Sequence, residues 1–105
     1  MKPQRLDKIQ EQQESAHRLY QAIASLKTSA EVQSFFNDLC TPTEIQAMAD
    51  RWWVVDLVKQ GIPYRQIHDM TGVSVTTIGR VARYIAMGAG GYELVYKRIR
   101  NTKIK

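Results

Sequence analysis

Two short helical segments joined by a glycine turn restrict the fold of this chain more than any other feature of its sequence. Gly72 stands where a helix ends in the left-handed conformation, which glycine adopts without a steric penalty. Ser74 follows as an N-cap, because its hydroxyl can accept a backbone N–H from the next helical turn. The spacing predicts one helix from Tyr64 to the residue before Gly72, and a second over 75–87.

The second of these helices has an apolar side and a polar side. At about 100° per residue, the apolar side consists of Ile78, Val81, Ala82 and Ile85. The other side and its flanks carry small polar and basic residues, namely Thr76, Thr77, Gly79, Arg80 and Arg83. Thr and Arg side chains can bind phosphates and base edges. On the preceding helix, Tyr64, Ile67 and Met70 form the expected apolar side.

This layout is typical of a helix-turn-helix, the motif that places a helix in the major groove of DNA. An ordinary helical hairpin with a solvated polar face has the same pattern, so the pattern alone leaves both interpretations open. The placement of charge favours the first.

Charge is distributed unevenly along the chain. Residues 1–58 contain six Lys or Arg and eight Asp or Glu, a net charge of −2, whereas residues 59–105 contain nine and two, a net charge of +7. The positive excess therefore lies in the half with the predicted helix-turn-helix. Double-stranded DNA is the expected partner, because each neutralised phosphate adds salt-sensitive affinity. For the cations at the C-terminal end, a solubilising tail is the alternative.

Length and composition fit a single globular domain over 1–105, with 44% hydrophobic residues. No apolar run approaches the roughly 20 residues of a membrane span, and no apolar signal-peptide core begins the chain. We therefore expect a cytoplasmic protein without a membrane partner. Cys40 is the only cysteine, which excludes an internal disulfide and is typical of a small core residue.

Helix signals account for the whole chain, and no strand signal stands out. Two capping-box sequences open helices, one from Thr28 to Glu31 and one from Thr41 to Glu44; in the first, Thr28 and Glu31 are expected to satisfy each other's N–H groups. The predicted fold class is all-α, with six helices at about 4–27, 28–39, 42–59 or 60, 64–71, 75–87 and 92–100.

The third predicted helix is apolar around most of its circumference, and such a helix must be buried on all sides. Its apolar residues are Ile45, Ala47, Met48, Ala49, Trp52, Trp53, Val54, Val55, Leu57 and Val58. A small monomer has little material to surround it. We therefore predict a homodimer whose N-terminal helices pack across the partner. Trp52 and Trp53 point about 100° apart, so we expect core or dimer packing rather than one stacking platform.

Several of these residues resemble the Trp repressor family. The matching runs are 39–51 (LCTPTEIQAMADR), the apolar helix ending at Gly61, 65–67 (RQI) and 77–80 (TIGR), within about 35–100. The ending GGYELV further resembles the YerC/YecD-type branch of Trp-repressor-like proteins from Gram-positive bacteria. The resemblance implies an intertwined, all-α homodimer of six-helix protomers that binds a palindromic operator. It places DNA contacts at Arg65, His68, Val75, Thr76, Thr77 and Gly79.

The resemblance also implies a small-molecule effector site. Two arginines of the Trp repressor hold the indole ring and carboxylate of tryptophan, and they map onto Arg51 and Arg80; Thr41 of the partner subunit borders the same pocket. Val81 and Tyr84 replace smaller residues and would narrow the pocket, which disfavours tryptophan as the effector. The alternatives are a salt bridge of Arg51 with a neighbouring Asp, Asp50 or Asp56, and a phosphate contact for Arg80.

The complete set of expected DNA-binding residues is Arg65, His68, Ser74, Val75, Thr76, Thr77, Gly79, Arg80 and Arg83, and the expected ligand-binding set is Thr41, Arg51, Arg80 and Tyr84. A helical protein-interaction module without DNA binding is the alternative function. We expect neither an enzyme nor a metal or cofactor site, because His17 and His68 lie in no Cys/His or Asp/His cluster of suitable spacing.

Overall fold

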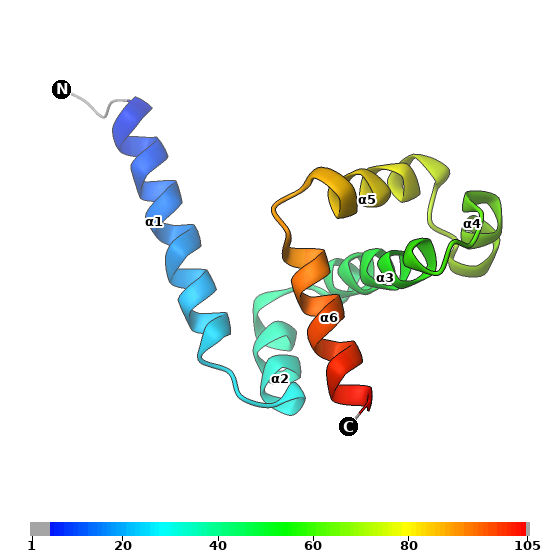
Figure 1. Ribbon diagram of the computed structural model, residues 1–105. Helices are drawn as coiled ribbons and strands as arrows, with labels where there is room; N and C mark the ends of the chain where they lie inside the picture. Colours follow the sequence, from blue (N-terminus) through cyan, green and yellow to red (C-terminus); the bar gives the residue numbers. More distant parts are fainter. Residues whose placement is uncertain (1–4, 105) are drawn as a thin grey trace. The chain divides into compact units, whose positions relative to one another are not determined.

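The computed structural model describes residues 5–104, and within that range the chain forms six α-helices and no strand. Figure 1 shows α1 (Arg5–Ala24), α2 (Ser29–Leu39), α3 (Pro42–Lys59), α4 (Tyr64–Thr71), α5 (Val75–Met87) and α6 (Gly91–Ile104). The predicted all-α class with six helices is confirmed. The chain divides into two compact units, α1 with α2 and α3 with α4–α6.

In the first unit, α1 ends at Ala24, three residues before the predicted end of that helix. The Ser25 hydroxyl donates to the carbonyl oxygen of Ala22 at 2.6 Å, and the Leu26 N–H donates to Ile23 at 3.1 Å. This tighter i−3 bonding closes the last turn, because Ser offers the backbone a local alternative to the α-helical bond. The first predicted position, residue 4, lies outside the described residues.

The capping box at the start of α2 forms in part as predicted. The Glu31 N–H donates to Thr28 Oγ1 at 3.1 Å, so Thr28 caps the helix. The Glu31 carboxylate, however, accepts from the backbone N–H of Lys27 at 2.8 Å, one residue before the predicted donor Thr28. The carboxylate still satisfies an N–H near the helix start. No residue of α2 is buried, so the cap rather than packing fixes the beginning of this helix.

The second unit has its core where α3, α4 and α5 meet. Its fully buried residues come from all three helices and are Val54, Val55, Leu57, Ile67, Ile78 and Val81. α4 follows the end of α3, and α5 then runs back alongside α3 (Figure 1). Burying several aliphatic side chains together is the main stabilising contribution to such a small core.

Two sequence-based expectations about this core need correction. α3 is not buried on all sides within one chain, because Ala47, Ala49 and Trp53 remain exposed. On α4, Tyr64 and Met70 are 41% and 44% exposed, although we placed them on its apolar side. Ile67 lies midway between them on the helical surface, so it enters the core and leaves its two neighbours at the edge.

α6 is longer than predicted and reaches Ile104 instead of ending near Arg100. The segment after Arg100 contains neither glycine nor proline, so nothing in it stops a helix. Thr102 Oγ1 donates to the carbonyl oxygen of Arg98 at 2.9 Å, four residues back along the helix. The fourth residue of α6, Leu94, already bonds back to the carbonyl oxygen of Gly90 at 3.1 Å.

Candidate nucleic-acid interface

The turn between α4 and α5 has the predicted glycine geometry. Gly72 caps α4 at φ 78° and ψ −2°, in the left-handed region, and its N–H donates to the carbonyl oxygen of His68 at 2.8 Å. A side chain at this φ would clash with the main chain, which is why glycine is suited to the position. The turn therefore ends α4 sharply and lets the chain enter α5 after three residues.

Two side chains of α4 hold the backbone of Val73 at both of its polar groups. Thr71 Oγ1 accepts the Val73 N–H at 3.0 Å and donates to the carbonyl oxygen of Ile67 at 2.8 Å. His68 Nδ1 lies 2.7 Å from the Val73 carbonyl oxygen. These contacts attach the turn to α4, so α5 starts from a fixed position relative to α4.

Ser74 caps α5, as the sequence predicts. Its hydroxyl oxygen accepts the Thr77 N–H at 3.1 Å, and the hydroxyl also bonds the Thr77 hydroxyl at 3.1 Å. An N-cap of this kind stabilises a helix by about 1 kcal/mol. The first turn of α5 is therefore ordered although it lies at the surface.

α5 presents the predicted polar edge to solvent while its other side enters the core. Ile78 and Val81 are buried, whereas Val75 is 52% exposed and Thr76 lies exposed beside it. Among the residues predicted for the interface, Arg65, His68, Ser74, Arg80 and Arg83 are also exposed, whereas Thr77 and Gly79 are half-buried. We refer to Val75, Thr76, Gly79, Arg80 and Arg83 as the α5 edge.

The surface of α4 and α5 carries more positive than negative charge. Between residues 64 and 87 there are three arginines, and Asp69 is the only acidic residue. Arginine binds phosphate through two parallel N–H groups and guanine through its O6 and N7 atoms. The α5 edge thus offers hydrogen-bond donors of the type that nucleic acids require, on a helix whose opposite side is packed into the core.

The predicted effector residues lie on the surface rather than in an enclosed site. Arg51, Arg80 and Tyr84 are exposed residues of the second unit, and Thr41 is an exposed residue just before α3. Val81 is buried in the core beside Ile78, as the 3.6-residue period of α5 predicts. That its side chain narrows an effector pocket stays a prediction.

The neighbouring carboxylates that could have paired with Arg51 are bonded to other groups. Asp50 accepts from Gln46 Nε2 at 2.8 Å. Asp56 accepts from Gln60 Nε2 at 3.0 Å and from the Tyr96 hydroxyl at 3.1 Å. The structure therefore does not support the salt-bridge alternative for this arginine.

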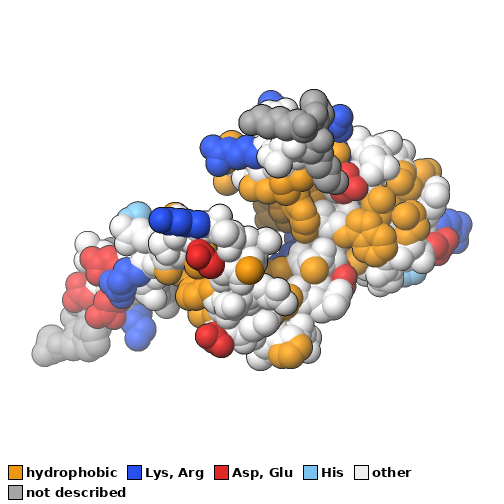
Figure 2. Space-filling view, turned by 90° about the horizontal axis from the view of Figure 1, so that it is seen from below, with side chains coloured by type: hydrophobic (Ala, Val, Ile, Leu, Met, Phe, Trp, Pro, Cys, Tyr) orange, Lys and Arg blue, Asp and Glu red, His pale blue; other side chains and the backbone are white. Residues whose placement is uncertain are grey.

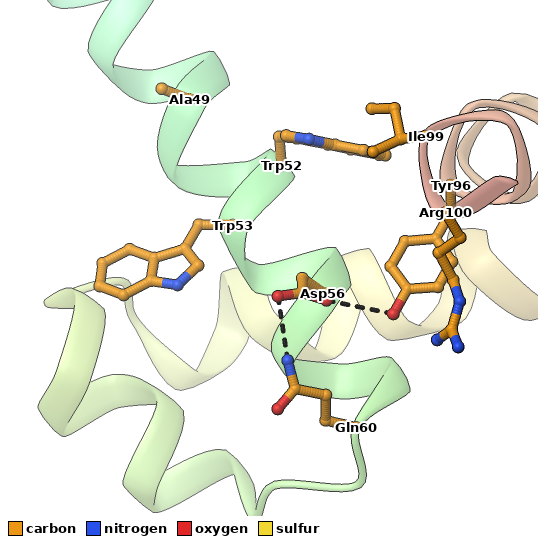
Figure 3. A pocket seen from close by; sticks show the side chains of 8 residues that line it. All are labelled: Ala49, Trp52, Trp53, Asp56, Gln60, Tyr96, Ile99 and Arg100. Carbon is orange, nitrogen blue, oxygen red and sulfur yellow. Dashed lines mark hydrogen bonds between the residues drawn. The ribbon is translucent and has the colours of Figure 1, made fainter. Parts of the chain in front are cut away.

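A pocket of about 640 Å³ that sequence reasoning missed lies between α3 and α6. Its lining residues are Ala49, Trp52, Trp53, Asp56, Gln60, Tyr96, Ile99 and Arg100 (Figure 3). The two indole rings extend in different directions from α3, as expected for neighbours on a helix, yet both border this pocket. Only the i, i+4 spacing of Asp56 and Gln60 was visible in the sequence; the pairing of α3 with α6 was not.

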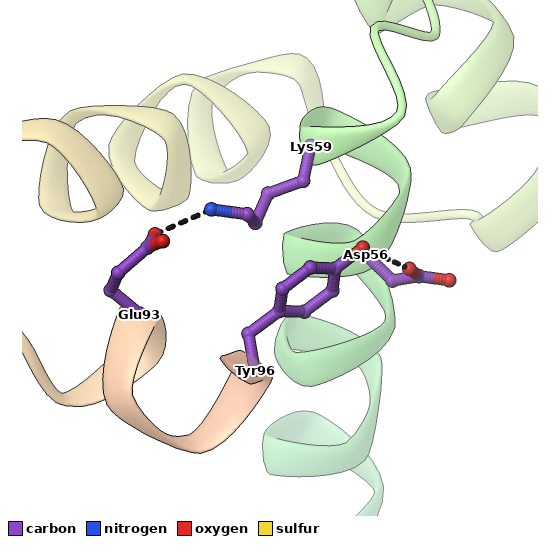
Figure 4. A network of polar contacts seen from close by, with 4 residues as sticks. All are labelled: Asp56, Lys59, Glu93 and Tyr96. Carbon is purple, nitrogen blue, oxygen red and sulfur yellow. Dashed lines mark hydrogen bonds and ion pairs between the residues drawn. The ribbon is translucent and has the colours of Figure 1, made fainter. Parts of the chain in front are cut away.

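Polar contacts fasten α6 to α3 beside the pocket. Lys59 Nζ forms an ion pair with Glu93 and lies 5.0 Å from the centre of the Tyr96 ring (Figure 4). The hydrogen bond from the Lys59 ammonium lowers the pKa of the Glu93 carboxyl below its usual value. Trp52 adds a contact with Tyr92, whose ring centre is 6.2 Å away.

Neither a metal centre nor a membrane span is found in the described part of the chain. Among those residues, no three or more His, Cys, Asp and Glu side chains gather where they could hold a metal ion. No helix between residues 5 and 104 combines the length and apolar character needed to cross a bilayer.

Comparisons with known proteins agree with this geometry. The family model described as Trp repressor protein matches residues 14–100. The uncharacterized protein YerC of Bacillus subtilis (strain 168) is 40% identical over 86 residues, which cover 82% of this chain and 83% of that protein.

Solved structures show the same similarity. A TrpR-like protein from Eubacterium eligens ATCC 27750 superposes with a TM-score of 0.77 at 37% identity, covering 82% of this chain and 89% of that one. A protein from Staphylococcus aureus gives a TM-score of 0.76 at 36% identity, covering 82% and 86%.

Proposed function

Because this chain belongs to the Trp repressor family, we propose that it is a dimeric, sequence-specific DNA-binding regulator that recognises a palindromic operator through its helix-turn-helix. The observation that carries the proposal is the α5 edge. Its members Thr76, Arg80 and Arg83 are polar or basic and open to solvent, while the opposite side of the same helix is fixed in the core. A helix with this division can enter a major groove without losing its contacts to the protein.

In the proposed complex, the residues of the helix-turn-helix divide into two groups by chemistry. Thr76 and Arg80 lie near the start of α5 and would meet base edges, because the first turns of a recognition helix reach deepest into the groove. Arg65, His68 and Arg83 would meet phosphates and set the register. The bound protein would block transcription sterically. Such a regulator acts where the bacterial chromosome lies, in the cytoplasm.

A second copy of this chain is the proposed partner for the apolar surfaces that one chain leaves open. α2 buries none of its residues, and Ile9 and Tyr20 of α1 are exposed. In the second unit, Trp53 is 43% exposed, and Leu94 and Ile99 of α6 are exposed. Figure 2 shows hydrophobic side chains gathered in patches on the face that it draws, and exposed apolar patches are typical of protein–protein interfaces.

Dimerisation also fits the proposed DNA geometry. Two recognition helices related by a twofold axis would enter successive major grooves, about 34–36 Å apart. The pocket between α3 and α6 is apolar enough, with Trp52, Trp53 and Ile99 in its lining, to receive side chains of the second copy. Helices α1 and α2 of that copy are the proposed occupants.

A small-molecule effector is the proposed ligand of two arginines in the second unit. Arg51 and Arg80 are exposed guanidinium groups on α3 and α5, two helices that pack against each other. Such a pair suits a small molecule with a carboxylate and an aromatic ring. A ligand held there would act by altering the separation of the two α5 helices.

Selection of bound fragments from a random DNA pool tests the proposed function. We expect a palindromic sequence, protected in footprinting at fixed salt, and Thr76→Ala and Arg80→Ala should weaken its binding by about tenfold or more each. Arg18→Ala, which removes the same charge from α1, should leave the sequence preference unchanged. If no palindrome is enriched, or if the two α5 variants bind as the wild type does, the helix-turn-helix function is wrong and a protein-interaction module becomes the better account.

A further inference from the structure

Gly79 occupies an interior position of α5 where the fold itself does not require a glycine. Its φ is not in the left-handed region, and a Cβ built on it meets no atom within 4 Å. Glycine weakens a helix interior relative to alanine, because it loses more backbone freedom on folding. The chain therefore retains a destabilising residue at a place where its own atoms leave room for a methyl group.

The position of this glycine on the helix gives the space a chemical character. Thr76 precedes it by three residues and Arg83 follows by four, so both lie next to it on the helical surface. Both are exposed, and Val75 adjoins them at the start of the helix. We call the gap at Gly79 between Thr76 and Arg83 the glycine notch.

Resting on the proposed function, we infer that the glycine notch is where the sugar–phosphate backbone of duplex DNA lies directly against the main chain of α5. The Arg83 guanidinium on one border is a donor suited to phosphate oxygens, and Thr76 on the other border is the residue proposed above to meet base edges. The backbone N–H groups in the middle of a helix are already bonded within it, so the notch itself can offer shape and closeness but no base-specific donor. Gly79 thus determines how deeply α5 enters the major groove, and a Cβ at this position would push the DNA strand away from the helix.

Gly79→Ala is the direct test, with Gly91→Ala as the matched control. Gly91 also has open space around its Cβ position and no left-handed φ, but it lies at the start of α6. We expect Gly79→Ala to raise the melting temperature of the free protein by about 4 °C, and to lower operator affinity by about tenfold or more. The Gly91 variant should leave operator affinity unchanged.

Two further measurements separate a backbone contact from base readout. Gly79→Ala should lower the binding affinity by the same factor for the operator and for operators with one changed base pair. Combined with Arg83→Ala, the loss should be smaller than the product of the single losses, because both residues act on one strand.

The outcomes that overturn the inference are distinct from those that overturn the proposed function. Undiminished operator binding by Gly79→Ala, a loss that depends on the base pair, or fully independent losses would each overturn the glycine notch alone. A lower melting temperature would do so too, since the fold would then need the glycine. A wild-type chain that binds no DNA would overturn both.

Discussion

His68 Nδ1 lies 2.7 Å from the carbonyl oxygen of Val73, across the turn between α4 and α5. A carbonyl oxygen only accepts, so Nδ1 must carry the proton, and the neutral ring then has Nε2 as its acceptor. One ring nitrogen of His68 can therefore hold the turn while the other stays available for a further contact.

The contact of His68 with Val73 predicts a graded effect of substitution. His68→Ala should lower the free energy of unfolding by about 1 kcal/mol, because the Val73 carbonyl loses its donor. His68→Asn should lose less, since its amide can place a donor near the position of Nδ1. Urea unfolding of both variants beside His17→Ala, a histidine exposed on α1, checks this. Equal losses for Ala and Asn would show that the hydrogen bond is not what stabilises the turn.

Substitution of Thr71 should lower the free energy of unfolding more than substitution of an ordinary threonine on a helix surface. Thr71→Val keeps the shape but removes the acceptor of the Val73 N–H, and should cost about 1–2 kcal/mol of unfolding free energy. Thr102→Val is the control, because that hydroxyl only repeats a helical i−4 contact on α6. A cost for the Thr102 variant as large as that for Thr71 would contradict the role of the turn.

Gly72 is the position where a side chain should strain the backbone. At φ 78°, Gly72→Ala should lower the unfolding free energy by about 1–2 kcal/mol. Gly79→Ala makes the same chemical change in a helical conformation and should have the opposite sign. Thermal unfolding of both proteins is the measurement, and a stable Gly72 variant would mean that the turn can adopt another conformation.

The ion pair of Lys59 and Glu93 predicts a defined pH dependence. The pKa of the Glu93 carboxyl is lowered in the folded protein. The carboxylate therefore stabilises the fold at pH values above the usual carboxyl pKa of about 4.3, and this stabilisation is lost as the pH falls through the pKa of the folded state. Glu93→Gln should therefore be less stable than the wild type at pH 7, and the difference should shrink as the pH falls below about 4.3. Urea titrations across this range, with Glu14→Gln as the control on α1, decide the matter; a constant difference at all pH values would contradict the linkage.

Dimerisation and DNA binding should separate by substitution. Trp53→Glu places a charge on an exposed apolar part of α3 and should convert a dimer of about twice 12.1 kDa into monomers in sedimentation at micromolar concentration. Val75→Glu makes a similar change on the α5 edge, and should keep the dimer but abolish operator binding. A wild-type protein that sediments as a 12.1 kDa monomer would refute the dimer.

Local signals allowed the helix-turn-helix to be predicted closely from the sequence. The left-handed Gly72 and the Ser74 cap act within a few residues, so their geometry follows from the residues themselves. Helix ends without such signals were less predictable. α6 continues past Arg100, because no glycine or proline follows that would end the helix.

The pocket between α3 and α6 could not be predicted, because it depends on contacts between distant parts of the chain. The Tyr96 hydroxyl and Asp56 are forty residues apart in sequence and 3.1 Å apart in space. Sequence periodicity indicates which side of each helix is apolar, but it does not say which helix will cover it. Val81, which the helical period assigned to the core, is buried there because its own helix carries the signal that places it.

With its N–H bound by Thr71 and its carbonyl by His68, Val73 has no freedom to act as a hinge. α4 and α5 consequently form one rigid unit. In the proposed dimer, a change in the distance between the two copies of this unit must rotate each of them as a rigid body. On either side of the motif the main chain bends at Gly61 and Gly90, where φ is positive and no neighbouring atom lies within 4 Å of the Cβ position. Under the proposed effector control, a substitution that stiffens either bend should weaken the response to the ligand while leaving the α5 edge unchanged.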